Sequence, residues 1–173
     1  QSWDFTPPVM KENPLGELHD TIIQHAYACA DDFGFKNYTL SMLNLWINVN
    51  KKGNSNAAHT HTGAVLSGVY YLSLPDCCYG NFTFQRNPVD QHLRESWGCS
   101  DNFNRSNELV ADEYDIYPEE DRLIIFPSWL THRVSPNVGE GARVSISFNI
   151  TAHSNFYHEI YPKRRDNRTK LSI

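Results

Sequence analysis

Three histidines stand where they could bind one metal ion together. His59 and His61 occur in the segment NAAHTHTGA, and His132 occurs in FPSWLTHRV. In an extended strand the side chains of residues i and i+2 point to the same face, so His59 and His61 can converge on one ion. Ferrous iron used for oxygen chemistry has three protein ligands on one side, which leaves open positions for a substrate and dioxygen. The pattern favours such a site over structural zinc, which would close with a fourth ligand such as Cys.

An arginine is expected to face the same cavity as the histidines. Arg143 comes eleven residues after His132, beyond a turn formed by Pro136–Gly141. An arginine on an otherwise apolar strand is costly to bury unless it meets an anion, and its planar guanidinium fits a carboxylate with two hydrogen bonds. Ser145 lies two residues further on the same face and could donate to that carboxylate. A structural ion pair is the alternative for Arg143, and the histidines favour a ligand carboxylate instead.

The elements that must position these side chains follow from the hydrophobic periodicity. Apolar residues recur every three or four positions over about 14–32, which predicts an amphipathic N-terminal helix. After this segment the period changes to two, which is typical of strands. One helix followed by about eight short strands predicts a mainly β protein, a jelly roll or cupin-like barrel with the helix packed on one sheet. The strands are predicted at about 42–49, 58–62, 65–74, 81–85, 113–117, 122–126, 131–135 and 142–151.

Length, composition and charge exclude several classes of protein. The 173 residues suffice for one domain, and 40% hydrophobic with 20% charged residues indicates a globular chain. The net charge of −5 argues against nucleic acid or an anionic membrane as a partner. No apolar run is long enough to span a bilayer.

The compartment is expected to be the cytoplasm. Four cysteines are too few and too scattered for a disulfide framework, which favours a reduced intracellular protein. Five N-x-[ST] sequons are a weaker indication of secretion, because the one at Asn149 falls in a predicted buried strand. The chain begins at Gln1 rather than at Met, so a leader or further residues upstream stay open.

Five segments together resemble the iron(II)/2-oxoglutarate-dependent dioxygenases. They are the H-x-H pair, SGVYYLSLP, GNFTF, LIIFPSWLTHRV and ARVSISFN, and they span about residues 40–151. The resemblance is strongest to the small oxygenases of bacteria and phages, which are relatives of the prolyl hydroxylases. It implies a double-stranded β-helix core over about 40–151, with residues 1–173 as a single oxygenase domain. The implied location is the cytoplasm of a bacterium or of a phage-infected host cell.

The resemblance implies three iron ligands. The first ligand of the family falls on His59 and the distal ligand on His132. Most of the superfamily has Asp or Glu where this chain has His61. Three neutral imidazoles leave the site one negative charge short of the usual set, which alters its redox poise and affinity. His61 is still expected to be the third ligand, because the nearest subfamily shares the H-x-H pattern.

The resemblance also implies the residues that hold 2-oxoglutarate. The basic residue that binds its far carboxylate falls on Arg143, in an Arg-x-Ser pattern with Ser145. The tyrosine that often joins this pair matches Tyr71. Asn48 is expected to contact the keto-acid end, and Asn50 has the same parity on its strand.

With iron(II) as cofactor and 2-oxoglutarate and dioxygen as cosubstrates, the resemblance implies a hydroxylase. Such an enzyme hydroxylates an unactivated C–H bond of a protein side chain or small molecule and releases succinate and CO2. Two alternatives stay open. One is a cupin-type three-histidine metalloenzyme that does not use 2-oxoglutarate, which has no need for a cavity arginine. The other is a non-catalytic jelly-roll binding module.

Other segments carry weaker expectations. Residues 86–112 are polar and long enough to form a substrate lid, with a homodimer contact as the alternative. Phe126 and Trp129 are expected to pack in the core rather than bind substrate. Residues 152–173 are expected to form a C-terminal tail, whose basic part at 163–170 is expected to be frayed, with a docking role as the alternative. The acidic stretch 108–121 mildly favours a neutral or cationic substrate, and a peptide and a small molecule both stay open.

Overall fold

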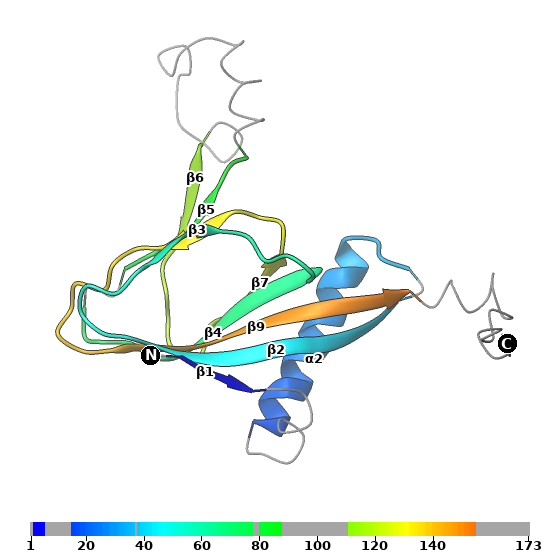
Figure 1. Ribbon diagram of the computed structural model, residues 1–173, viewed down its shortest axis with the longest axis horizontal. Helices are drawn as coiled ribbons and strands as arrows, with labels where there is room; N and C mark the ends of the chain where they lie inside the picture. Colours follow the sequence, from blue (N-terminus) through cyan, green and yellow to red (C-terminus); the bar gives the residue numbers. More distant parts are fainter. Residues whose placement is uncertain (1, 6–14, 37, 78–79, 88–110, 155–173) are drawn as a thin grey trace, which may run out of the picture.

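Two antiparallel β-sheets face one another, and one helix covers the outer side of the larger sheet (Figure 1). The computed structural model describes residues 2–5, 15–36, 38–77, 80–87 and 111–154. The larger sheet contains, in spatial order, β1 (Ser2–Phe5), β2 (Tyr38–Asn50), β9 (Arg143–Ser154), β4 (Leu66–Ser73) and β7 (Leu123–Pro127). The smaller sheet contains β3 (Asn56–His59), β8 (His132–Val134), β5 (Phe82–Gln85) and β6 (Glu113–Ile116). This mainly β architecture, with the helix α2 (Gly16–Asp32) near its N-terminus, confirms the predicted fold class.

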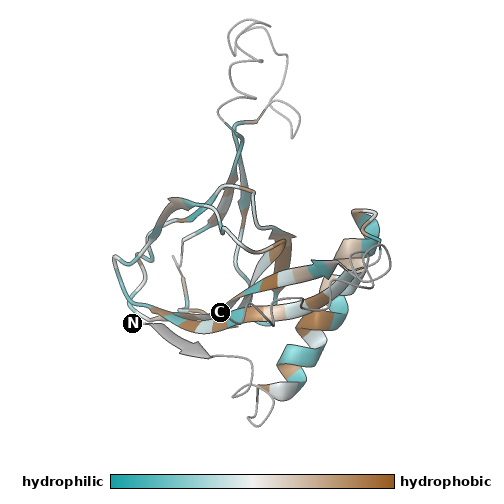
Figure 2. Ribbon diagram, turned by 45° about the vertical axis from the view of Figure 1, so that its right-hand side comes forward, coloured by the Kyte–Doolittle hydropathy of each residue, from teal (hydrophilic) through white to brown (hydrophobic). Residues whose placement is uncertain are grey.

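Helix α2 packs on the larger sheet through one apolar face. Ile22, Ala26 and Ala30 follow one another at intervals of four residues and are at most 4% exposed. They belong to a cluster of buried side chains that includes Leu45 of β2 and Phe148 of β9. Figure 2 shows apolar and hydrophilic residues alternating along α2, beside the apolar stretches of the neighbouring strands. The predicted amphipathic helix is confirmed. Among the described residues, no helix is long and apolar enough to cross a membrane.

Strand β9 contributes side chains to both faces of the larger sheet. Its side chains alternate, so that Ile146, Phe148 and Ile150 face α2 and are at most 1% exposed. We call the opposite side, which points toward the smaller sheet, the inner face. Pairing with the neighbouring strands places Asn48 and Tyr71 opposite the same serine of β9, on this inner face. The residues that β9 itself contributes to the inner face are polar: Arg143, Ser145, Ser147 and Asn149.

A bulge in β2 decides which of its residues reach the inner face. The register between β2 and β9 shifts between Met42 and Asn44, which makes Leu43 the extra residue, and its side chain is 42% exposed. Before the bulge the even-numbered residues pack against α2, and after it the odd-numbered residues do so. The inner face of β2 therefore carries Trp46, Asn48 and Asn50.

The observed strands differ from the predicted ones in a few places. Strand β1 is not predicted, and it forms by pairing with the edge of β2. The sequence predicts a strand over 58–62, but β3 ends at His59. The chain then turns away from β8, and the backbone N–H of His61 donates to the carbonyl of Ser128 at 2.9 Å. Strand β9 continues to Ser154, so the predicted tail starts too early at residue 152, because residues 152–154 pair with β2. The rest of the tail and most of the predicted lid lie outside the described residues.

The connection from β8 to β9 is held in place by one buried asparagine. Asn137 is fully buried, and its side-chain Nδ2 donates to the carbonyls of Asn50 at 2.9 Å and Gly141 at 2.8 Å. Its Oδ1 accepts from the N–H of Gly139 at 3.0 Å, and its own N–H donates to the carbonyl of Asn54 at 3.0 Å. These bonds tie the turn that precedes Arg143 to the end of β2 and the turn after it.

We expect Asn137→Ala to lower the free energy of unfolding by about 2–4 kcal/mol, because two carbonyls and one N–H lose a buried partner. Urea unfolding followed by circular dichroism measures the change. Val138→Ala is the matched control, since this neighbouring side chain is 61% exposed and its loss should change the stability by less than about 0.5 kcal/mol. Equal effects of the two substitutions would contradict this role of Asn137.

Candidate active site

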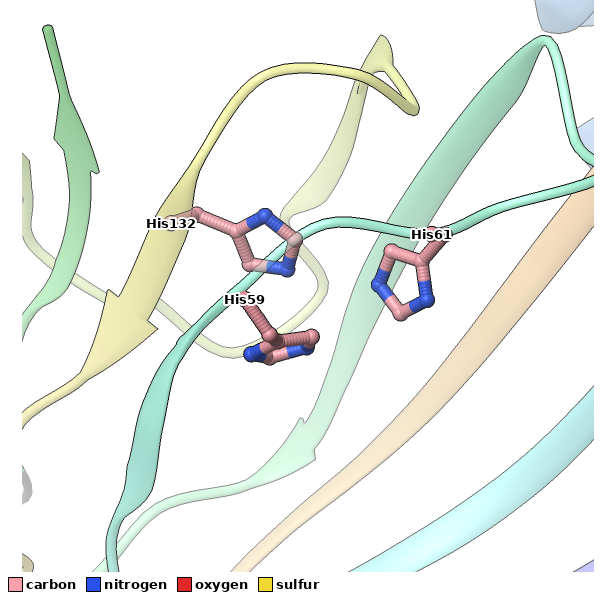
Figure 3. A group of neighbouring side chains, drawn as sticks. All are labelled: His59, His61 and His132. Atoms are coloured by element: carbon pink, nitrogen blue, oxygen red, sulfur yellow. The ribbon is translucent and has the colours of Figure 1, made fainter. Parts of the chain in front are cut away.

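Three imidazoles converge between the two sheets. His59, at the end of β3, lies directly across from its strand partner His132 of β8. His61 follows β3 in the connection to β4. One ring nitrogen from each histidine lies within 4.8 Å of the others, and the rings gather around a common centre (Figure 3). The predicted histidines therefore come together, close enough to bind one ion from one side.

Backbone carbonyls orient two of the three rings. Nδ1 of His59 lies 2.7 Å from the carbonyl oxygen of Ala57, and Nδ1 of His132 lies 2.9 Å from that of Leu130. A carbonyl oxygen can only accept, so Nδ1 of each ring carries the proton. Nε2 of each ring then keeps its lone pair. Metal-binding histidines are held in this way, with one ring nitrogen bonded to the protein and the other offered to the ion.

Aromatic side chains surround His132 and keep it dry. His132 is 3% exposed, and its ring lies 5.2 Å from the ring of Phe82, nearly parallel to it, and 4.7 Å from the ring of Phe126. Burial lowers the pKa of His132 to about 4, and the neighbouring His59 and His61 add to this effect. Burial and the neighbouring His59 also lower the pKa of His61. His61 and His132 are therefore neutral at pH 7, which is the form that binds a metal ion.

A buried guanidinium lines the same cavity as the histidines. Arg143 is 2% exposed, Tyr71 is 1% exposed and Ser145 is 5% exposed, and all three face this cavity. Burial lowers the pKa of Arg143, an effect that the neighbouring Tyr71 opposes, but an arginine remains charged at pH 7. Burial raises the pKa of Tyr71 to about 12, so its phenol stays protonated and can donate a hydrogen bond.

The charge of the cavity suits an anionic ligand. Its volume is about 520 Å³, including the part that is open to solvent. Among the described residues that line it there is no Asp or Glu, and Arg143 is the formally charged side chain. Nη1 of Arg143 donates to the backbone carbonyl of Ser135 at 3.5 Å. Neutral nitrogen donors and a guanidinium in one cavity fit a divalent cation together with a ligand that carries carboxylates.

Two asparagines and a tryptophan complete the wall that β2 forms. Asn48 and Asn50 both face the cavity, as their shared parity predicts, and Nδ2 of Asn48 donates to Oγ of Ser147 at 2.9 Å. The ring of Trp46 lies 6.1 Å from that of His61. The sequence analysis does not predict Trp46 or Ser147 as site residues. The signal is present, since Trp46 lies two residues before Asn48 and Ser147 two residues after Ser145, on the same face of each strand.

The predicted role of Trp129 in the core is wrong. Its side chain is 72% exposed, whereas Phe126, for which the same role is predicted, is 5% exposed. Strand β7 ends at Pro127, and the N–H of Leu130 donates to the carbonyl of Pro127 at 2.9 Å. Trp129 therefore stands at the corner of a turn, where an apolar residue no longer alternates between the faces of a sheet.

The chain matches the family described as "Putative 2OG-Fe(II) oxygenase" over residues 44–149. This range is more than half of the 173 residues and contains every residue that lines the cavity. No curated protein matches the chain.

Solved structures share the fold at low sequence identity. An oxidoreductase of the 2OG-Fe(II) oxygenase family from Burkholderia pseudomallei is 16% identical, with a TM-score of 0.51 over 71% of this chain and 50% of that one. HygX from Streptomyces hygroscopicus, with iron bound, is 11% identical, with a TM-score of 0.54 over 87% of this chain and 71% of that one. The viral collagen prolyl hydroxylase vCPH from Paramecium Bursaria Chlorella virus-1, in complex with 2OG, is 14% identical, with a TM-score of 0.53 over 87% and 78%. The chain thus spans half the length of the first of these proteins.

The metal-free protein should lose stability as the pH falls from about 6.5 to about 4. The folded state holds the pKa of His132 at about 4, whereas the unfolded chain takes up this proton near pH 6.5. The contribution is fully present above pH 6.5 and is lost as protons bind the unfolded state first. We expect the difference in unfolding free energy between the wild type and His132→Gln, measured in EDTA, to shift against the wild type over this range. A constant difference would show that His132 is not buried in its neutral form.

Proposed function

The chain belongs to the 2OG-Fe(II) oxygenase family, and we propose that it hydroxylates a C–H bond of a small molecule or protein side chain. The observation that carries this proposal is the shared cavity, in which three converging imidazoles and a buried guanidinium lie together. When bound, iron(II) and 2-oxoglutarate supply dioxygen activation, and the overall reaction releases succinate and CO2.

His59, His61 and His132 would hold the iron. The carbonyls of Ala57 and Leu130 fix the tautomers of the first and third, so that Nε2 is the ligand atom in each. Packing against aromatic rings holds His132 in one orientation, which lowers the reorganisation needed when a metal binds.

Arg143 would bind the far carboxylate of 2-oxoglutarate with both arms of its guanidinium. The phenol of Tyr71 and the hydroxyl of Ser145, which are strand partners, can donate to the same carboxylate. The keto-acid end would then point toward the histidines, and Asn48, the strand partner of Ser145, would lie beside the bound molecule. A divalent ion and one guanidinium more than balance the two negative charges of the cosubstrate, since no carboxylate ligand contributes.

The walls of the cavity keep water from this charged centre. Phe82 and Phe126 cover one side of His132, and Trp46 lies beside His61. In a dry pocket the attraction between the guanidinium and a carboxylate is stronger than in water, and reactive species are protected from side reactions. The chain contributes orientation and exclusion of water.

The two alternatives leave features of the site unexplained. A three-histidine metalloenzyme that does not use 2-oxoglutarate gives no reason for a buried guanidinium in the lining of the cavity. A non-catalytic binding module gives no reason for three converging imidazoles, two of them held with Nε2 available. Membership of the oxygenase family favours the proposed reading over both.

Anaerobic titration with iron(II) and 2-oxoglutarate should produce a saturable metal-to-ligand charge-transfer band in the visible range. His132→Ala should abolish the band, because one of three ligands is lost. Arg143→Gln should keep iron binding and weaken 2-oxoglutarate binding by about 10–100-fold, which is the size of a lost charge-assisted hydrogen bond. The dependence of the band on 2-oxoglutarate concentration measures this change.

Arg133→Gln is the matched control for this titration. Arg133 follows a proposed ligand but pairs with Glu113 at 2.7 Å, and it does not line the cavity. Its substitution should leave both affinities unchanged. Iron binding without the band would favour the metalloenzyme that does not use 2-oxoglutarate, and no iron binding would favour the binding module.

Exchange of His61 for a carboxylate tests whether this residue touches the metal. His61→Asp adds a negative charge beside the ion, so we expect tighter iron(II) binding and weaker binding of the dianionic 2-oxoglutarate than in the wild type. His61→Asn is the neutral control of the same shape. Isothermal titration with each ligand measures both affinities, and identical results for the Asp and Asn variants would remove His61 from the metal site.

A further inference from the structure

We propose that the apolar part of an uncharged, ring-containing small molecule binds in a groove beside His61, and that this molecule is the primary substrate. The inference rests on the proposed function, because it assigns the substrate class of that same site. The groove, which we call the apolar groove, is lined by Phe33 and Phe35 after α2, by residues 60–66 and by residues 127–129. Its volume is about 980 Å³, including the part that is open to solvent.

His61 connects the apolar groove to the cavity of the active site. It lines both hollows, and it is one of the three histidines whose ring nitrogens converge. A molecule that lies in the groove is therefore next to a proposed metal ligand. It does not contact Arg143, which lines the cavity and not the groove. The groove and the binding site for 2-oxoglutarate can be filled at the same time.

Two large aromatic side chains at the groove are turned to solvent. Trp129 is 72% exposed and Phe33 is 54% exposed. Single exposed apolar residues are common, but two aromatic rings that line one hollow next to a reactive centre are typical of a ligand site. Rings of this kind contribute large contact areas at a small cost in side-chain entropy.

The groove lacks a partner for a charged ligand. Among the described residues that line it there is no Asp, Glu, Lys or Arg. A charged group placed there would lose water without gaining an ion pair, which is unfavourable. Thr60 and Thr62 are exposed residues of its lining, and a threonine hydroxyl can form a hydrogen bond with a neutral polar group. The ligand is therefore uncharged, which agrees with the expectation that the acidic stretch 108–121 favours a neutral or cationic substrate.

The backbone groups of Val65 and Ser128, in the middle of the groove lining, are already occupied by internal hydrogen bonds. The carbonyl of Ser128 accepts from the N–H of His61 at 2.9 Å, and the N–H of Ser128 donates to the carbonyl of Val65 at 3.1 Å. The N–H of Val65 donates to the carbonyl of Ile150 at 2.8 Å. An extended peptide that binds by adding a strand needs such backbone groups to be available. This argues for a small molecule that uses side-chain contacts.

Binding of 2-naphthol, compared with the 2-naphthoate anion, tests the groove in the metal-free protein. Ligand-observed NMR should show that 2-naphthol binds at least about tenfold more tightly, because the two probes share the same ring and the charge of the carboxylate finds no opposite charge in the described lining. Phe33→Ala and Trp129→Ala should each weaken its binding by about fivefold. Tyr117→Ala is the matched control, since this aromatic side chain is 63% exposed and lies outside the groove.

Phe33 is the decisive position of the two. Trp129 also lines a second hollow, which contains Arg86 and Glu113, whereas Phe33 lines the apolar groove and not this second hollow. Equal affinity for the neutral and anionic probes, or no effect of Phe33→Ala, would overturn the proposal. A capped, uncharged proline-rich peptide that binds more tightly than 2-naphthol, and depends on Phe33, would replace the small molecule by a peptide and also overturn it.

Manganese(II) places the bound probe relative to the metal. In protein loaded with Mn(II), the protons of bound 2-naphthol should relax faster than in His132→Ala protein treated in the same way. Binding without this enhancement would overturn the placement of the groove beside the active site. A charge-transfer band with iron(II) and 2-oxoglutarate in a protein that fails to bind 2-naphthol would reject the groove and leave the proposed function intact.

Discussion

Strand β9 pairs with β2 along one edge and with β4 along the other, and this double pairing decides what faces the cavity. Because side chains alternate along a strand, one stretch of chain supplies both the apolar layer under α2 and the polar wall of the site. Phe148 and Ile146 are anchored in the core beneath the helix. Arg143 and Ser145 are thereby fixed on the opposite face, and a slip of one residue would exchange the two sets.

The smaller sheet contributes the other half of the site under a different constraint. Strands β3 and β8 are short, and their pairing places His59 opposite His132. Stability at this side comes from aromatic packing, since Phe82, Phe84 and Phe126 surround one of the imidazoles. A guanidinium and dry imidazoles are unfavourable to bury, and the layer under α2 supplies the apolar burial that offsets this cost.

Much of this arrangement is readable in the sequence because it depends on local spacing. The H-x-H pair, a histidine that begins a short strand and an arginine that begins an apolar strand each break a regular pattern, and the structure brings all of them to one cavity. Features that depend on distant pairing are not readable. Strand β1 forms by pairing with β2, far along the chain. Trp129 lies in a turn and is exposed to solvent, although the apolar pattern predicts that it is buried.

The bulge at Leu43 divides β2 into two parts that can vary under different rules. An insertion or deletion between Tyr38 and Met42 changes only how this end of the strand meets α2 and β9, and the bulge can absorb it. A one-residue insertion or deletion between Asn44 and Ile47 would place Ile47 instead of Asn48 at the wall of the cavity. Related chains should therefore tolerate length changes on the helix-docking side of Leu43 and keep a fixed length on the side of the site.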